Sequence, residues 1–143
     1  MPARTAQAQW TGTLLEGKGT FALGSGAFSG SYDWRSRSAD GVGTNPEELI
    51  AGAHAGCYSM ALSAVLTGHG HTVNSIHTSA TVHLEKDGDG FSIKNIDLTT
   101  EAEIPGISEE DFQKHATEAK LNCPVSKVLA GANITLNATV KSA

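Results

Sequence analysis

The part of the chain that most constrains its fold is residues 49–66, eighteen positions without Asp, Glu, Lys or Arg. A helix start lies directly before this stretch, because Thr44 or Asn45 can cap a helix and Pro46 suits its first position. Each of these caps has a glutamate three residues later, which is the capping-box spacing. The Gly68–Gly70 segment ends the helix. Because small and apolar side chains occupy nearly every face, the sequence predicts a buried central helix.

Residues 10–37, before this helix, predict short strands joined by glycine-rich turns. In the last of these strands, Tyr32 and Trp34 share one parity, whereas Arg35 and Arg37 share the other. Side chains alternate between the two faces of a strand. The pattern therefore predicts that both arginines lie on a strand, on the face opposite the aromatic rings.

The chain after the central helix predicts two long strands, two helices and a final strand. The expected boundaries are strands over 76–85 and 91–98 with a turn at 87–90 and a bulge near 94–95, a helix from 108, a short helix over 125–129, and a strand over 133–141. With antiparallel hairpins, the order β-β-β-α-β-β-α-α-β is typical of an α+β fold. A length of 143 residues predicts a single domain over residues 1–143.

Composition and charge narrow the classes of function. Charged residues make up 17% of the chain, below the usual ~25%, which leaves little polar surface for a monomer and favours an oligomer. A net charge of −5 without a basic cluster disfavours binding to nucleic acid or to an anionic membrane. The N-terminus lacks a signal-peptide core, and His54, Cys57 and small residues interrupt the apolar stretch before it reaches about 20 residues. We therefore expect a cytoplasmic enzyme or ligand-binding domain without a membrane span.

The two cysteines are 66 residues apart, a spacing typical of neither a zinc site nor a CxxC redox pair. Cys57 lies within the buried helix, where low dielectric disfavours a thiolate. Cys123 precedes Pro124 at the start of the third helix, where the helix dipole favours a thiolate. These positions make Cys123 the more reactive sulfur, unless the guanidinium of Arg35 or Arg37 reverses the order. Two buried thiols that act only as small apolar side chains are an equally good interpretation.

Two longer motifs carry a family pattern. The first is Arg37 followed by Gly43-Thr44-Asn45-Pro46-Glu47-Glu48-Leu49-Ile50 and Ala53-His54-Ala55-Gly56-Cys57-Tyr58-Ser59-Met60-Ala61-Leu62, and the second is Asn122-Cys123-Pro124-Val125-Ser126-Lys127-Val128-Leu129. With these motifs the chain resembles, over essentially its whole length, the osmotically inducible protein C (OsmC) family. That family includes the organic hydroperoxide resistance proteins (Ohr), and the motifs here are closer to OsmC proper.

The resemblance implies an OsmC-like α+β fold with antiparallel sheets around a long buried central helix, in an intertwined homodimer. It implies a cysteine-based peroxidase for organic hydroperoxides, in which Cys57 is peroxidatic and Cys123 is resolving. By motif position, Arg37 holds the thiolate and the peroxide, and Glu47 orients Arg37. Cys57 becomes a sulfenic acid and then a disulfide with Cys123, which an external dithiol reduces. That dithiol is lipoyl-type in the Ohr branch, and no cofactor or metal is expected.

The spacing between Glu47 and Cys57 bears on the oligomer. Ten helical residues span about 15 Å, so Arg37 held by Glu47 is poorly placed to reach Cys57 of its own chain. Two such helices packed antiparallel across a two-fold axis would bring Glu47 of one near Cys57 of the other. The spacing therefore predicts an obligate homodimer with shared active sites. Apolar neighbours of Cys57 favour alkyl hydroperoxides over hydrogen peroxide, and these neighbours are Ile50, Ala53, Met60 and Ala61.

Two alternative functions remain open. His54 lies three residues before Cys57 on one helix face, as a Cys-His hydrolase would require, although a core histidine bonded to a backbone carbonyl is the simpler interpretation. A non-catalytic dimer that binds an apolar ligand is the second alternative. The pair His69 and His71 is a weak metal signal without a nearby carboxylate and favours a solvated turn. The strand face with His77, His83 and Glu85 is predicted to face solvent.

Overall fold

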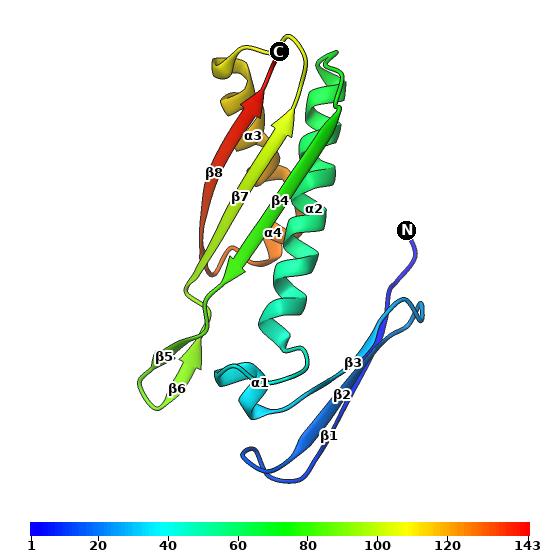
Figure 1. Ribbon diagram of the computed structural model, residues 1–143, viewed down its shortest axis with the longest axis vertical. Helices are drawn as coiled ribbons and strands as arrows, with labels where there is room; N and C mark the ends of the chain where they lie inside the picture. Colours follow the sequence, from blue (N-terminus) through cyan, green and yellow to red (C-terminus); the bar gives the residue numbers. More distant parts are fainter. The chain divides into compact units, whose positions relative to one another are not determined.

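The computed structural model describes residues 1–143, which form two compact units, residues 1–49 and 50–143. The first unit contains β1 (Ala6–Thr11), β2 (Lys18–Leu23), β3 (Ser29–Tyr32) and α1 (Trp34–Ser38), as Figure 1 shows. Its sheet is antiparallel in the order β1-β2-β3. The ring of Tyr32 stacks on Phe21 at 4.1 Å between centroids and lies 5.4 Å from the ring of Trp10. Gly19 between them has no room for a Cβ against these rings.

Helix α1 corrects the strand predicted for Arg35 and Arg37. The strand β3 ends at Tyr32, and both arginines lie on α1. The cause is a capping box: the Asp33 carboxylate accepts from the N–H of Ser36 at 2.7 Å, and the Ser36 hydroxyl accepts from the N–H of Asp33 at 2.9 Å. These bonds satisfy backbone N–H groups at the start of α1 that have no partner within the helix.

The second unit contains most of the long helix α2, which runs over Pro46–Gly68 and begins in the first unit. Its other elements are β4 (Ser75–Val82), β5 (Glu85–Asp87), β6 (Gly90–Ser92), β7 (Asn95–Glu103), α3 (Glu109–Asn122), α4 (Pro124–Val128) and β8 (Asn133–Lys141). Their order agrees closely with the prediction, except that β5 and β6 form a small separate hairpin. Instead of a bulge, the phase change near residue 94 is the break between β6 and β7.

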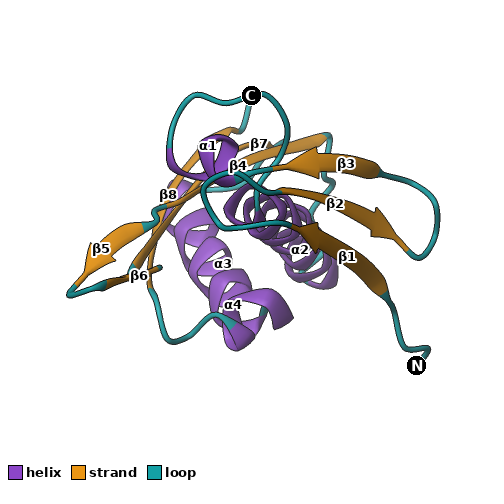
Figure 2. Ribbon diagram, turned by 90° about the horizontal axis from the view of Figure 1, so that it is seen from below, coloured by secondary structure: helices purple, strands orange, loops and turns teal.

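The main sheet of the second unit has the order β4-β7-β8. It is mixed, whereas the prediction was an antiparallel sheet. Strand β4 pairs with β7 antiparallel, with Ser75 opposite Glu103. Strands β7 and β8 are parallel, with Asn95 opposite Asn133. The chain leaves β7 at Glu103, passes through α3 and α4, and enters β8 at Asn133, beside the start of β7, as a parallel crossover requires. Helices α2, α3 and α4 all lie on one face of this sheet (Figure 2).

Helix α2 is buried on one face only, which corrects the prediction of a helix buried all round. Tyr58, Leu62 and Leu66 are fully buried and join the core with Phe112 of α3. On another face Gly52, Gly56 and Met60 are exposed, and Met60 is 76% exposed. By length and composition alone, α2 could cross a membrane, a test that core helices of globular proteins also pass. Its buried face is that of a core helix.

Capping residues at the helix starts follow the predictions. The Asn45 side chain accepts from the N–H of Glu48 at 2.8 Å at the start of α2, and the Ser108 hydroxyl accepts from the N–H of Asp111 at 3.1 Å at the start of α3. Cys123 ends α3 and is the N-cap residue of α4. One cysteine therefore lies at the junction of two helices, and the other lies within α2.

Candidate functional site

In the first unit, Arg37 of α1 is paired with Glu47 of the first turn of α2. Arg37 Nη2 donates to Glu47 Oε1 at 2.8 Å, and Arg37 Nε lies 3.1 and 3.3 Å from Oε1 and Oε2. Glu47 is 7% exposed, whereas the Arg37 side chain remains 36% exposed. A guanidinium fork held along one side by a buried carboxylate is fixed in direction. The guanidinium keeps an exposed side, so it can still meet an anion.

In the second unit, the two cysteines lie together. The Sγ atoms of Cys57 and Cys123 are 3.1 Å apart, and both thiols are free. A disulfide bond is about 2.05 Å long, so a shift of about 1 Å would join them. Cys123 is fully buried, whereas Cys57 is partly exposed. A molecule arriving from solvent therefore meets Cys57 first.

The two thiols differ in the pKa that their surroundings impose. For Cys57, burial raises the pKa, and the opposing N–H of Val125 does not compensate. For Cys123, burial also acts upward, but the N–H of Ser126, the Cys57 thiol and the Ser126 hydroxyl together lower the pKa below its ordinary value. The Cys123 side chain makes no capping hydrogen bond of standard geometry, so the N–H groups act on it as dipoles. This order of the two thiols is the one that the helix dipole predicts.

His54 lies beside the thiols but bonds to neither. It is fully buried, and its Nε2 lies 2.7 Å from the hydroxyl oxygen of Ser126. Its Nδ1 is buried without a hydrogen-bond partner, and burial lowers the pKa of His54. The expected bond to a backbone carbonyl is therefore wrong, because the partner is a hydroxyl. Nor does His54 pair with Cys57, as a Cys-His hydrolase would need.

Ser126 is the residue of this region that sequence reasoning missed. It is 6% exposed and connects His54 to Cys123 through one hydroxyl. Its position three residues after an N-cap is where a side chain can turn back to the cap, and this was the available signal. We call His54, Cys57, Cys123 and Ser126 the thiol cluster.

The comparisons with known proteins follow this geometry. The family model described as "OsmC-like protein" matches residues 38–139. The chain is 45% identical to "Peroxiredoxin OsmC" of Escherichia coli over 140 residues, covering 97% of both proteins. The chain belongs to the OsmC-like family. The matched range contains Glu47, Cys57 and Cys123, and it begins one residue after Arg37.

Other members of the OsmC-like family extend the comparison. The chain is 34% identical to "Organic hydroperoxide resistance protein-like 1" of Staphylococcus epidermidis over 106 residues, covering 73% of this chain and 74% of that protein. The crystal structure of the organic hydroperoxide resistance protein OhrB of Bacillus subtilis superposes with a TM-score of 0.68 at 26% identity, covering 96% and 98% of the two chains. The likeness covers nearly the whole of both chains, so this chain has the OsmC-like fold.

Proposed function

We propose that this protein is a cysteine-based peroxidase that reduces organic hydroperoxides to alcohols. The observation that carries the proposal is the pair of free sulfurs, 3.1 Å apart, of which only Cys57 is exposed to an incoming molecule. The names of its relatives, a peroxiredoxin and hydroperoxide resistance proteins, support the same chemistry. On this proposal, residues 1–143 act as one functional domain.

The reaction balances with these two sulfurs and an external dithiol. The Cys57 thiolate attacks the terminal peroxide oxygen, the O–O bond breaks, and the alkoxide leaves and takes a proton to become the alcohol. Cys57 is then a sulfenic acid. The Cys123 thiolate attacks the Cys57 sulfur, expels hydroxide as water after protonation, and forms the disulfide. A dithiol, of which a lipoyl-type dithiol is one candidate, reduces this disulfide by exchange.

The proposed role of Arg37 is to offset the raised pKa of Cys57 and so favour its thiolate. Within the chain, burial disfavours the Cys57 thiolate, so the attacking form needs a nearby cation. Arg37 carries a full charge held by Glu47. It would stabilise the Cys57 thiolate and the negative charge that develops on the leaving oxygen.

We propose that the protein works as a homodimer with shared active sites. Support comes from the exposed apolar face of α2, with Gly52, Gly56 and Met60, which a second copy of α2 would cover. Ten residues of α2 separate Glu47 from Cys57, about 15 Å. Antiparallel pairing of two α2 helices would bring Arg37 and Glu47 of one copy to Cys57 of the other.

A glycine substitution on α2 tests the dimer. A Cβ at Gly56 would meet nothing within 4 Å in the chain itself, so Gly56→Leu leaves the single chain undisturbed and obstructs only close helix approach. We expect a dimer by light scattering for the wild type, and a monomer for Gly56→Leu. Gly131→Leu, at an equally open position elsewhere, should remain dimeric. A monomeric wild type would refute the dimer without touching the thiol chemistry.

Peroxide consumption tests the reaction itself. Reduced protein is assayed with tert-butyl hydroperoxide, cumene hydroperoxide and hydrogen peroxide. Dithiothreitol or dihydrolipoamide is the reductant. We expect the organic peroxides to be consumed faster, Cys57→Ser to abolish turnover, and Cys123→Ser to accumulate a sulfenic acid that dimedone traps. Thiols that stay free by mass after peroxide treatment would instead favour the apolar-ligand-binding dimer. Ester hydrolysis that survives Cys123→Ser would favour the hydrolase.

A cytoplasmic location, without binding to membranes or nucleic acid, is part of the same proposal.

A further inference from the structure

A second polar cluster lies in the second unit, apart from the thiols. Helix α2 ends at Gly68, and His69 and His71 follow in the turn. His115 and Glu118 come from α3, which packs beside α2 (Figure 1). One ligand atom from each of His69, His115 and Glu118 lies within 4.8 Å of the other two. We call His69, His71, His115 and Glu118 the histidine cluster.

His115 is the buried member of the cluster, and it lacks a partner. The residue is 5% exposed, and its Nδ1 makes no hydrogen bond. Glu118 Oε2 lies 3.7 Å from this nitrogen, too far for a hydrogen bond. A buried polar atom without a partner is destabilising and needs an explanation. A bound cation would use this nitrogen's lone pair.

His69 is held in a tautomer that suits metal binding. Its Nδ1 lies 2.9 Å from the carbonyl oxygen of Val65. Because a carbonyl only accepts, Nδ1 carries the hydrogen, and in the neutral ring Nε2 keeps its lone pair. A metal-binding histidine commonly donates its other N–H to a carbonyl in this way, which fixes the ring.

The remaining groups complete a plausible coordination set. Glu118 contributes a negative charge from a side chain that is 43% exposed and free to adjust. The rings of His69 and His71 lie 4.2 and 5.8 Å from the ring of His115, between centroids. Ligand atoms on a tetrahedral cation with bonds of about 2.1 Å lie about 3.4 Å apart. Small movements of the exposed His69 and the half-buried Glu118 would reach that spacing, and His71 or a water would take the fourth position.

We propose that His69, His115 and Glu118 form a binding site for a divalent transition cation of the zinc type. Two imidazoles and one carboxylate are ligands that such cations prefer, whereas Mg²⁺ and Ca²⁺ prefer oxygen. The bound cation joins the end of α2 to α3. Twelve residues of α2 and its following turn separate Cys57 from His69, about 18 Å at the rise of a helix. The cation therefore has a structural role and takes no part at the thiol cluster.

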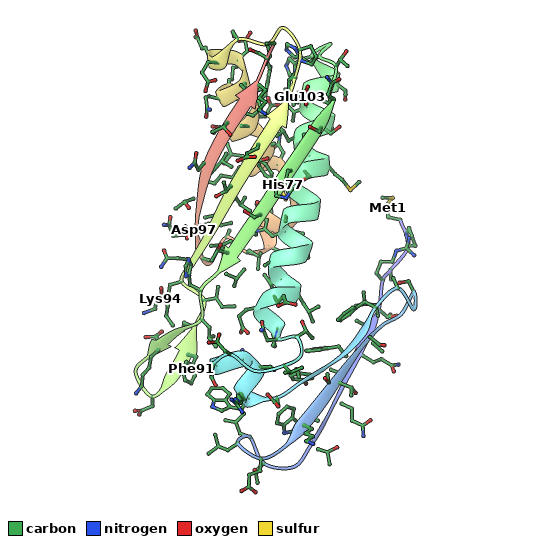
Figure 3. The ribbon with its side chains drawn as sticks, viewed as in Figure 1. Met1, His77, Phe91, Lys94, Asp97 and Glu103 are labelled. Atoms are coloured by element: carbon green, nitrogen blue, oxygen red, sulfur yellow. The ribbon has the colours of Figure 1, made fainter.

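The test measures zinc binding by tag-free reduced protein in competition with a chromophoric chelator. We expect one Zn²⁺ per chain, with affinity lowered about tenfold or more by His69→Ala and by Glu118→Gln. Both side chains are partly or fully exposed, so these variants keep the fold. The matched control is His77→Ala, an exposed histidine on β4 (Figure 3), which should bind as the wild type does.

Thiols also bind zinc, so the site must be distinguished from the cysteines. The double variant Cys57→Ser/Cys123→Ser should keep the same affinity, and Co²⁺ bound to the wild type should give a spectrum without sulfur-to-metal charge transfer. Zn²⁺ should raise the melting temperature of the wild type but not of His69→Ala. The proposal is overturned if binding disappears with the cysteines, or if His69→Ala and His77→Ala bind equally.

Discussion

The thiol cluster joins α2 to α4, the histidine cluster joins the end of α2 to α3, and the two clusters suit different chemistry. Each contains a buried histidine whose Nδ1 has no hydrogen-bond partner, His54 in one and His115 in the other. The second nitrogen of His54 meets the hydroxyl of Ser126, and the cluster's other members are two thiols. His115 instead faces an imidazole and a carboxylate. The difference teaches that the neighbours of a buried histidine decide what it can bind: the thiol cluster contains no charged partner, so the proposed peroxidase reaction would need a cation from outside it.

The largest expected effect comes from releasing that cation. Glu47→Gln removes the charge that orients Arg37, so we expect kcat/KM with tert-butyl hydroperoxide to fall about 10- to 100-fold. Glu48→Gln, at the exposed neighbouring position, is the matched control and should keep its rate. Equal activity in both variants would mean that Glu47 does not position Arg37 for the reaction.

The next effect sharpens the contrast within the thiol cluster. Ser126 lowers the pKa of Cys123 through its N–H and its hydroxyl. Ser126→Ala removes only the hydroxyl and should therefore raise the pKa of Cys123 in part. The measurement is alkylation of each cysteine as a function of pH, resolved by peptide mass. In the monomeric Gly56→Leu variant, where no second copy supplies Arg37, Cys123 should become reactive at lower pH than Cys57. The same order in the wild-type dimer would show that Arg37 does not stabilise the Cys57 thiolate.

A smaller effect is the contribution of His54 to the pH dependence of folding stability. Burial holds the pKa of His54 below its ordinary value of 6.5, so below pH 6.5 the unfolded chain binds this proton more readily than the folded one. Stability therefore falls as pH drops from 6.5 towards the folded pKa, by up to about 1.4 kcal/mol per pH unit. Urea unfolding of the wild type and His54→Gln between pH 7.5 and 5 should show a steeper loss in the wild type. Parallel curves would place the titrating group elsewhere.

The smallest expected effect is an absence of coupling between the clusters. If Zn²⁺ binds at the histidine cluster, saturation with Zn²⁺ should leave the alkylation rate of Cys123 unchanged while the melting temperature rises. Iodoacetamide labelling followed by mass spectrometry measures both cysteines in one sample. Protection of Cys123 by Zn²⁺ would mean that the metal binds the thiols instead of the histidine cluster.

Local sequence signals predicted the helices well and the longer-range arrangement less well. The caps at Asn45 and Ser108 and the break at Cys123 were readable because capping depends on residues three positions apart. Asp33 and Ser36 have the same three-residue spacing and cap α1. The alternation of aromatic residues there led to the prediction of a strand instead. Side-chain alternation cannot distinguish a short amphipathic turn from a strand end when only a few residues are involved.

Contacts between distant segments explain the rest of the difference. The parallel partner of β7 could not be predicted, because strand direction depends on how α3 and α4 return the chain. The pairing of His54 with Ser126 spans 72 residues, and Glu118 approaches His69 only through helix packing. The exposed face of α2 could not be predicted for another reason. A helix without charged residues is predicted to be buried, whether its own chain or another surface covers it.

The distance in sequence between the two cysteines has a consequence for the lifetime of the protein. A bond between Cys57 and Cys123 would close a loop of 66 residues, and such a crosslink reduces the entropy of the unfolded chain by an amount equivalent to about 4 kcal/mol. The oxidised form would then unfold less often than the reduced form. Proteases that act on unfolded chains would spare molecules that have reacted and await their reductant, so the pool of protein would persist during oxidative conditions and turn over faster once they end.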